Sequence, residues 1–203
     1  MTKLKAFEEL CRLMDGKYYE VVDPDLGIYS SHCEYVTYNN FVERIDELLE
    51  LVEEVLPSGW SFSIDFGLDW GPSLYEVYID KSKDVVRVKM DVDVCSSEKR
   101  AHSLVKECIS TILHDLSNLI KKELPHSKVE ESTGVLPPEL APQCEGDTLA
   151  YAQLEIEVPI DELPKLVNTV QPRDLAREIA YECEISPAHF THPYGTWRRI
   201  TSL

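Results

Sequence analysis

Two short runs of alternating acidic and apolar residues carry the most direct chemical signal in the sequence. Asp91 and Asp93 stand in the run Asp-Val-Asp-Val, and Glu155 and Glu157 stand in Leu-Glu-Ile-Glu-Val. Residues two apart on a strand share a face and lie roughly 7 Å apart, so each run places two carboxylates side by side. Carboxylate oxygens bind Mg²⁺ and Mn²⁺, which assist phosphoryl transfer. One hypothesis is therefore a metal-dependent phosphoryl-transfer enzyme; the alternative is a solvated sheet face with no chemistry.

Cysteine and histidine residues suggest two further sites. Cys183, His189 and His192 have five and two residues between them, which is conceivable for zinc. Cys95 precedes a predicted helix that carries His102, an arrangement that can activate a thiol nucleophile. The sequence shows neither a tight zinc knuckle nor a third group to orient the histidine. An irregular tail with surface histidines and a partly buried thiol explain the same residues more simply.

A third pattern is an acidic helix over residues 39–56. Apolar residues such as Phe41, Ile45 and Leu48 recur at helical spacing, and acidic residues take most of the other positions against the single Arg44. An acidic face with aromatic residues nearby suits a basic partner, because complementary charge raises the association rate and specificity. The predicted partner-binding residues are Glu43, Asp46, Glu47, Glu50, Glu53 and Glu54, with Asp65, Asp80, Asp91 and Asp93 on the sheet as a second patch.

Charge and composition limit the classes of function. The 203 residues include 37 acidic and 20 basic side chains, for a net charge of −17. This balance disfavours direct binding to nucleic acid, which needs cationic side chains at the phosphates, and docking on an anionic membrane. The hydrophobic fraction of 43% is that of an ordinary globular protein.

Four alternating segments predict the strands that would position these acids. Residues 60–68, 75–80, 86–94 and 150–158 alternate apolar and polar side chains, as half-buried strands do. The first three are joined by short turns and form an antiparallel meander. Wide apolar faces on the helices at 39–56 and 96–124 would cover its dry side. The predicted fold is two-layer α+β, with a sheet of four or more antiparallel strands and two long helices on one face.

The expected organisation is a main domain with an appended C-terminal segment. Residues 1–158 make the α+β domain, within which the proline-rich stretch 125–148 is predicted to be a loop. Residues 159–203 contain a helix beginning near Pro172 and an irregular tail, which we expect to pack on the same domain. Whether this segment covers the acidic face of the sheet is open, as is the oligomeric state.

Cysteine spacing and the N-terminus suggest a compartment. The six cysteines are dispersed and no Cys-x-x-Cys occurs, a pattern typical of reduced, buried thiols in a cytosolic protein. Glu8 and Glu9 interrupt the N-terminus before any apolar stretch of a secretory signal can form. No window approaches the length of a membrane span. We therefore expect a cytoplasmic protein.

The favoured functional hypothesis is a non-enzymatic, acidic protein-interaction module. Its partner would be a basic protein, and the module would act as an inhibitor or nucleic-acid mimic of a protein that handles nucleic acid. No cofactor is expected under this hypothesis. The alternative enzyme would bind Mg²⁺ or Mn²⁺ through the metal-ligand candidates Asp91, Asp93, Glu155 and Glu157.

Overall fold

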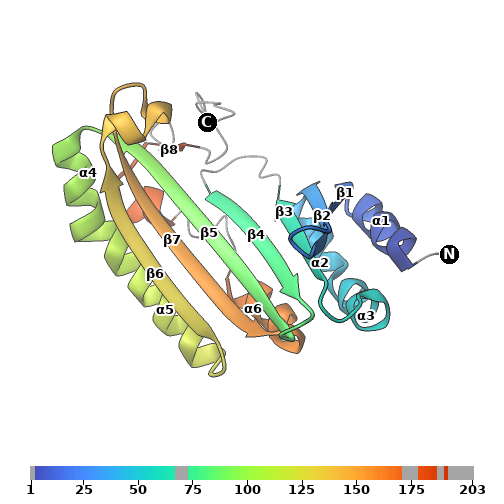
Figure 1. Ribbon diagram of the computed structural model, residues 1–203. Coiled ribbons are helices and arrows are strands. Elements are labelled where there is room, and N and C mark those ends of the chain that lie inside the picture. Colours follow the sequence, from blue (N-terminus) through green and yellow to red (C-terminus); the bar gives the residue numbers. More distant parts are fainter. Residues whose placement is uncertain (1–2, 67–72, 171–177, 187–189, 192–203) are drawn as a thin grey trace. The chain divides into compact units, whose positions relative to one another are not determined.

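The computed structural model describes residues 3–66, 73–170, 178–186 and 190–191 (Figure 1). It confirms an α+β protein with a mostly antiparallel sheet, whose strands follow the order β1-β2-β3-β4-β5-β7-β6, with β8 paired to β5. The strands are β1 (Lys17–Asp23), β2 (Ile28–Val36), β3 (Ser61–Phe66), β4 (Ser73–Asp80), β5 (Val85–Ser96), β6 (Lys128–Leu136), β7 (Thr148–Pro159) and β8 (Phe190–Thr191). The helices are α1 (Lys3–Leu13), α2 (Tyr38–Glu43), α3 (Ile45–Val55), α4 (Glu98–Leu104), α5 (Ser110–Glu123) and α6 (Leu163–Thr169), with the π-helical turn η1 (Val105–Ile109) and the 3-10 turns η2 (Pro138–Leu140), η3 (Pro142–Cys144) and η4 (Ile160–Glu162).

The chain forms two compact units, each assembled from distant parts of the sequence. The first unit comprises Met1–Asp69, Glu76–Val88 and Glu157–Asn168. The second comprises Trp70–Tyr75, Lys89–Ile156 and Thr169–Leu203. The two long helical regions belong to different units, so their predicted position on one face of the sheet stays a prediction.

In the first unit, the alternation of β3 produces a dry face and a polar face, as its sequence predicts. Phe62, Ile64 and Phe66 are buried. The Phe7 ring of α1 lies 4.7 Å from the Phe62 ring between centroids, and the Phe41 ring of α2 lies 4.9 Å from the Phe66 ring. The helices thus cover the apolar face of β3, and the polar residues of the strand lie on the opposite face.

The helix predicted over 39–56 is two helices. Thr37 caps α2 by accepting a hydrogen bond from the Asn40 backbone N–H, so the helix begins earlier than Asn39. Arg44 interrupts the helix with φ −109° and ψ 9°, outside the helical region, and α3 starts at the next residue. Leu56 ends α3 just before Pro57, since a residue before proline is pushed away from helical angles.

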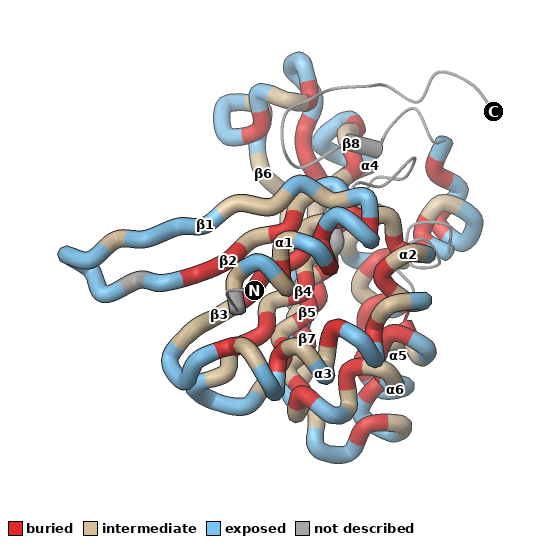
Figure 2. The backbone as a smooth tube through the Cα atoms, turned by 90° about the vertical axis from the view of Figure 1, so that its right-hand side faces the viewer, coloured by how far each residue is buried: buried red, intermediate tan, exposed pale blue. Residues whose placement is uncertain are grey.

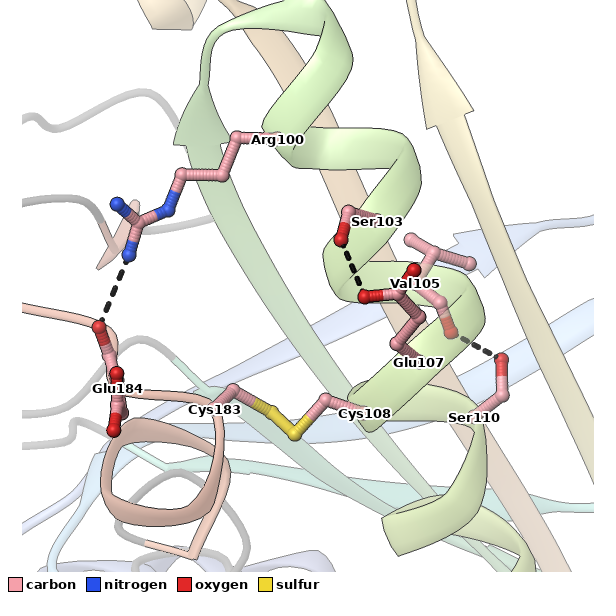
Figure 3. Close-up of a disulfide and its surroundings, with 8 residues drawn as sticks. All are labelled: Arg100, Ser103, Val105, Glu107, Cys108, Ser110, Cys183 and Glu184. Atoms are coloured by element: carbon pink, nitrogen blue, oxygen red, sulfur yellow. Dashed lines mark hydrogen bonds between the residues drawn. A yellow bond between two sulfur atoms is a disulfide. The ribbon is translucent and has the colours of Figure 1, made fainter.

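In the second unit, the helix predicted over 96–124 is present but contains a π-helical turn. The Ser110 backbone N–H bonds to the Val105 carbonyl five residues earlier, and the Ser110 hydroxyl donates to the same oxygen at 2.7 Å (Figure 3). Cys108 lies within this turn and is bonded to Cys183. An inserted π turn changes the direction of the following side chains, and here it coincides with the covalent link to the C-terminal segment.

The prediction of a loop over residues 125–148 is wrong for the first half of this stretch, which contains strand β6. Its side chains are mostly exposed or half-buried, so the strand lacks the apolar alternation that would identify it. β6 lies at the end of the strand order, where one edge has no neighbour among the described residues. Gly134 allows close packing on β7, because a Cβ there would lie 2.6 Å from the Tyr151 hydroxyl oxygen. η2 and η3 follow β6.

The prediction of reduced thiols is wrong, because all six cysteines form disulfides. The pairs are Cys11–Cys33, Cys95–Cys144 and Cys108–Cys183, at sequence separations of 22, 49 and 75. Strand and helix packing brings these residues together, and no local motif records it. The dispersed spacing of the cysteines in the sequence was therefore compatible with either state.

No helix in the described part of the chain is long and apolar enough to cross a membrane. The predicted helix start at Pro172 and the histidines His189 and His192 lie outside the described residues.

Candidate functional site

The helices α2 and α3 present a continuous acidic surface. Ile45, Leu48 and Val52 are buried on one side of α3. The Arg44 Nη1 atom lies 2.6 Å from the Glu47 Oε1 atom, which is the single ion pair of this surface among the described residues. All six predicted partner-binding acids of the helices are exposed, and we call them the helix acid surface: Glu43, Asp46, Glu47, Glu50, Glu53 and Glu54.

The distribution of these acids along α3 is unfavourable for the helix itself. Asp46 and Glu47 lie in the first turn, where negative charge stabilises a helix. Glu53 and Glu54 lie at the other end, where the helix dipole disfavours negative charge, and no basic residue occupies the last turn. The acids at this end therefore have no local structural benefit.

A second group of polar residues lies on the sheet of the first unit. The parallel pairing of β2 with β3 and the antiparallel pairing of β3 with β4 align their residues in rows across the strands. Neighbouring strands are about 4.8 Å apart, so side chains in one row are close neighbours. One row contains three acids beside a lysine, and the next contains a histidine between aromatic and serine residues. The rows are Lys17–Glu34–Asp65–Glu76 and Tyr19–His32–Ser63–Tyr78.

Asp65 is the most perturbed acid of these rows. Burial and, to a smaller extent, the neighbouring negative charges of Glu76 and Glu34 together raise its pKa to about 6. The Asp65 Oδ1 atom is buried and has no hydrogen-bond partner. This row is therefore a strongly negative strip in which one carboxylate is poorly solvated.

His32 is held between two hydroxyl groups. Its Nδ1 atom is 2.6 Å from Ser63 Oγ, and its Nε2 atom is 2.8 Å from Ser30 Oγ. The ring stacks on Tyr19 at 4.9 Å between centroids, and the Tyr19 hydroxyl donates to Glu34 Oε1 at 2.8 Å. Burial lowers the pKa of His32 although Glu34 acts in the opposite direction. A neutral imidazole can donate to one serine and accept from the other.

The geometry of His32 favours a structural role over nucleophilic catalysis. Ser30 and Ser63 are only 8% and 3% exposed, so neither hydroxyl is presented to a substrate. The network instead fixes the position of Tyr19 and, through it, of Glu34. The His32 row is thus connected to Glu34 of the acidic row through the Tyr19 hydroxyl.

Asp80 and Asp65 were both predicted to bind the partner from the sheet, but the structure places them in different surroundings. Asp80 is 7% exposed and accepts hydrogen bonds from the Ser82 backbone N–H and hydroxyl through its Oδ1 atom. Lys83 and Arg87 each lie 3.9 Å from its Oδ2 atom. The Asp80 carboxylate therefore closes the turn between β4 and β5.

The metal-ligand candidates of the second unit lie on β5 and β7. Lys89 Nζ is 3.3 Å from Asp91 Oδ2. Burial is the largest cause that raises the pKa of Asp93 to about 6; the Asp91 charge contributes to this shift, and the Lys89 charge opposes it. Asp93 pairs with Thr191 of β8. Glu155 is half-buried on β7, and Glu157, also half-buried, belongs to the first unit.

Metal-ligating side chains do not gather among the residues that the structure describes. No group of three or more His, Cys, Asp or Glu side chains in that part of the chain is placed to hold a metal ion. The thiol hypotheses are wrong, because Cys95 is bonded to Cys144 and Cys183 to Cys108. Neither residue offers a thiolate to zinc or to a substrate.

The sequence pattern did not indicate Glu34 or the His32 network as functional residues. Glu76 stands in an alternating strand, so its face was predictable, but its row partners were not. Those partners depend on the parallel pairing of β2 with β3, which connects segments about 30 residues apart through α2 and α3.

The chain matches no protein-family model, and no curated protein matches its sequence. Any function proposed for it is therefore derived from its own surfaces.

Proposed function

We propose that the protein is a non-enzymatic interaction module that binds a basic partner protein through the helix acid surface. The observation that carries this proposal is the exposure of all six acids on α2 and α3, while the apolar side of α3 is buried. Glu53 and Glu54 weaken the helix dipole interaction, and partner binding gives a reason for their presence.

Physical chemistry indicates the kind of partner. A cluster of exposed carboxylates attracts cationic side chains over about a Debye length, roughly 8 Å at physiological salt, and raises the association rate. In α3, Asp46, Glu50 and Glu53 recur at spacings of four and three residues, which places them on one stripe. A regular stripe of negative charge fits the groove of a protein that binds nucleic acid, so we infer an inhibitor or nucleic-acid mimic.

The acidic row on the sheet supplies a second patch to this proposal. Asp65, with Glu34 and Glu76 beside it, has an uncompensated negative charge that a Lys or Arg of the partner would neutralise. Asp80 is left out of the proposed surface, because its carboxylate is buried and bonded within its own turn.

The disulfides limit where this function is carried out. Disulfides persist in oxidising compartments and in the cytoplasm of some hyperthermophiles, and are rare in a reducing cytosol. We therefore propose a cytoplasmic location only for a cell in which the cytoplasm allows the three disulfides to persist.

A charge-reversal experiment tests the proposed function. The wild-type chain and a Glu47→Lys/Glu50→Lys variant are used as baits in native lysate at low and high salt, and bound proteins are identified by mass spectrometry. For a basic partner retained by the wild type at low salt, we expect the association rate to fall by on the order of tenfold in the variant.

The matched control is Glu139→Lys/Asp147→Lys, which makes the same charge change at two exposed residues of the second unit. This control should retain the partner. Equal loss in both variants would indicate a net-charge effect, and unchanged binding in the Glu47→Lys/Glu50→Lys variant would exclude α3 as the site.

A further inference from the structure

The β1–β2 hairpin exposes a sheet edge and several apolar side chains. β1 stands at the end of the strand order, and among the described residues its neighbouring strand is β2. β3 pairs with β2 only from Ser30 onward, so the outer part of the hairpin extends beyond β3. Figure 2 shows this hairpin with most of β1 and its turn exposed. Its exposed apolar residues include Val21 at 39%, Val22 at 55% and Leu26 at 72%.

The sequence of β1 is complementary to itself in one antiparallel register. The strand reads Lys-Tyr-Tyr-Glu-Val-Val-Asp from Lys17 to Asp23. If Glu20 lies on a two-fold axis, Lys17 faces Asp23 of a second copy at both ends of the ladder. The same register places Tyr18 opposite Val22 and Tyr19 opposite Val21, and pairs of aromatic and β-branched residues stabilise neighbouring strands.

From this complementarity we propose that two copies of the chain associate through β1, in an antiparallel ladder centred on Glu20. The proposal is independent of the helix acid surface. Each protomer contributes the same strand, so the interface is self-complementary and closes with two-fold symmetry. The ladder joins the sheets of the two copies at the β1 edge.

Charge selects this register over its neighbours. Charged residues on an edge strand normally prevent strand pairing. Shifting the ladder by two residues places Lys17 opposite Val21, or Asp23 opposite Tyr19, and both ion pairs are lost. The centred register is therefore the one in which the charges at the ends of β1 favour association.

Exposed leucines lie near both ends of the proposed ladder. In the proposed ladder, the hairpin turn of one copy lies next to the Lys17 end of the other copy. Helix α1 ends near Lys17, with Leu13 as its last residue. Leu13 is 55% exposed and Leu26 is 72% exposed. Burial of such side chains between copies adds an apolar contribution to the pairing.

The charge at the centre makes the association weak and sensitive to salt. The two copies of Glu20 face each other, and each chain carries a net charge of −17. Screening reduces this repulsion, so the proposed dimer strengthens as salt rises. A complex with a basic partner has the opposite salt dependence, which separates the two kinds of association experimentally.

Cysteine cross-linking tests the register. All six native cysteines are paired, so one introduced cysteine has no free thiol to react with inside its own chain. In a Glu20→Cys variant, two thiols on the two-fold axis lie within disulfide range, about 4.5–5.5 Å between Cα atoms. When the two thiols form a disulfide, they release two electrons and two protons, which oxygen takes up with a copper catalyst. We expect the product to run as a covalent dimer on a non-reducing gel.

Val22→Cys is the matched control for cross-linking, because its copies lie roughly 13 Å apart in this register. We expect little cross-linking of this variant. A Val22→Cys dimer that forms as readily as the Glu20→Cys dimer would overturn the register.

Sedimentation velocity over a range of protein and salt concentrations tests the equilibrium. The wild type should show a dimer that strengthens with salt. In Lys17→Asp, two like-charge contacts replace the two ion pairs, and we expect the dimer Kd to rise roughly tenfold. The control Lys5→Asp makes the same charge change on exposed α1 and should behave as the wild type. Circular dichroism verifies that each variant is folded.

Three outcomes would overturn the proposal. The first is a wild-type chain that stays monomeric at every concentration and salt. The second is a dimer whose Kd is the same in Lys17→Asp and in Lys5→Asp. The third is a monomeric chain whose β1 residues instead bind a segment of a basic protein, which would assign the edge to that partner.

Discussion

The acids of α3 and the acids of the sheet are the same residue types in opposite situations. The residues of the helix acid surface are exposed, and one ion pair, Arg44–Glu47, involves them within the described residues. Asp65 and Asp93 are half-buried, and burial is the largest cause that raises the pKa of each to about 6. The comparison shows that a count of acids does not identify a binding surface, since burial decides how each charge can be used.

The two sheet acids also differ from each other. The neighbours that shift the pKa of Asp65 are acidic, whereas Asp93 has Lys89 acting against Asp91. Asp65 keeps one buried oxygen without a hydrogen-bond partner. Both carboxylates therefore reduce the stability of the fold when ionised, and neutral replacements measure by how much.

Asp93→Asn should give the largest change in stability. The folded protein holds the Asp93 proton up to about pH 6, whereas the unfolded chain releases it near pH 4, so wild-type stability falls as pH rises through this range. The variant stays neutral and should exceed the wild type by about 2–3 kcal/mol above pH 7, with no difference below about pH 4. Urea unfolding at several pH values measures this, and a loss of stability at pH 7 would contradict it.

Asp65→Asn should act in the same direction with a smaller effect. The sign is the same, because the pKa of Asp65 is also raised. Solvent reaches more of this side chain, which lowers the expected gain above pH 7 to about 1 kcal/mol. The matched variant Glu76→Gln removes one neighbouring charge and should lower the pKa of Asp65. An NMR titration of the Asp65 carboxyl that shows no change would exclude Glu76 as a cause.

The ends of α3 should show the smallest effects, with opposite signs. Glu53→Gln/Glu54→Gln removes negative charge from the C-terminal end and should stabilise the protein by about 0.5–1 kcal/mol at low salt. Asp46→Asn removes charge from the first turn and should destabilise it by a similar amount or less. Thermal unfolding in low and high salt measures both changes. Equal signs would show that self-repulsion of the surface, and not the helix dipole, dominates.

Local patterns in the sequence were sufficient for much of the fold. The alternation of β3 and β5 identified their buried sides, and the apolar spacing of α3 identified its buried face. These predictions succeed because the spacing of apolar residues within one strand or helix depends only on which side of that element is buried. The exposure of Glu47 and Glu50 follows from the same pattern.

Features that depend on distant residues were not predictable. β6 has no apolar alternation, and it is recognised as a strand only by its partner β7. The row of Glu34, Asp65 and Glu76 requires the parallel pairing of β2 and β3. The half-burial of Asp93 depends on the packing of β5 and its neighbours, which the Asp-Val-Asp-Val pattern does not record.

The disulfides also determine how far the chain can be stretched. Pulled from its two ends, the oxidised protein transmits force across the Cys11–Cys33 and Cys108–Cys183 bonds, which bypass segments with separations of 22 and 75 residues. At roughly 3.5 Å per extended residue, the bypassed segments amount to about 340 Å of slack that force alone cannot release. In a single-molecule pulling experiment, the oxidised chain would therefore extend to about half of its full contour length. The remaining length would be released only after a reductant cleaves the disulfides.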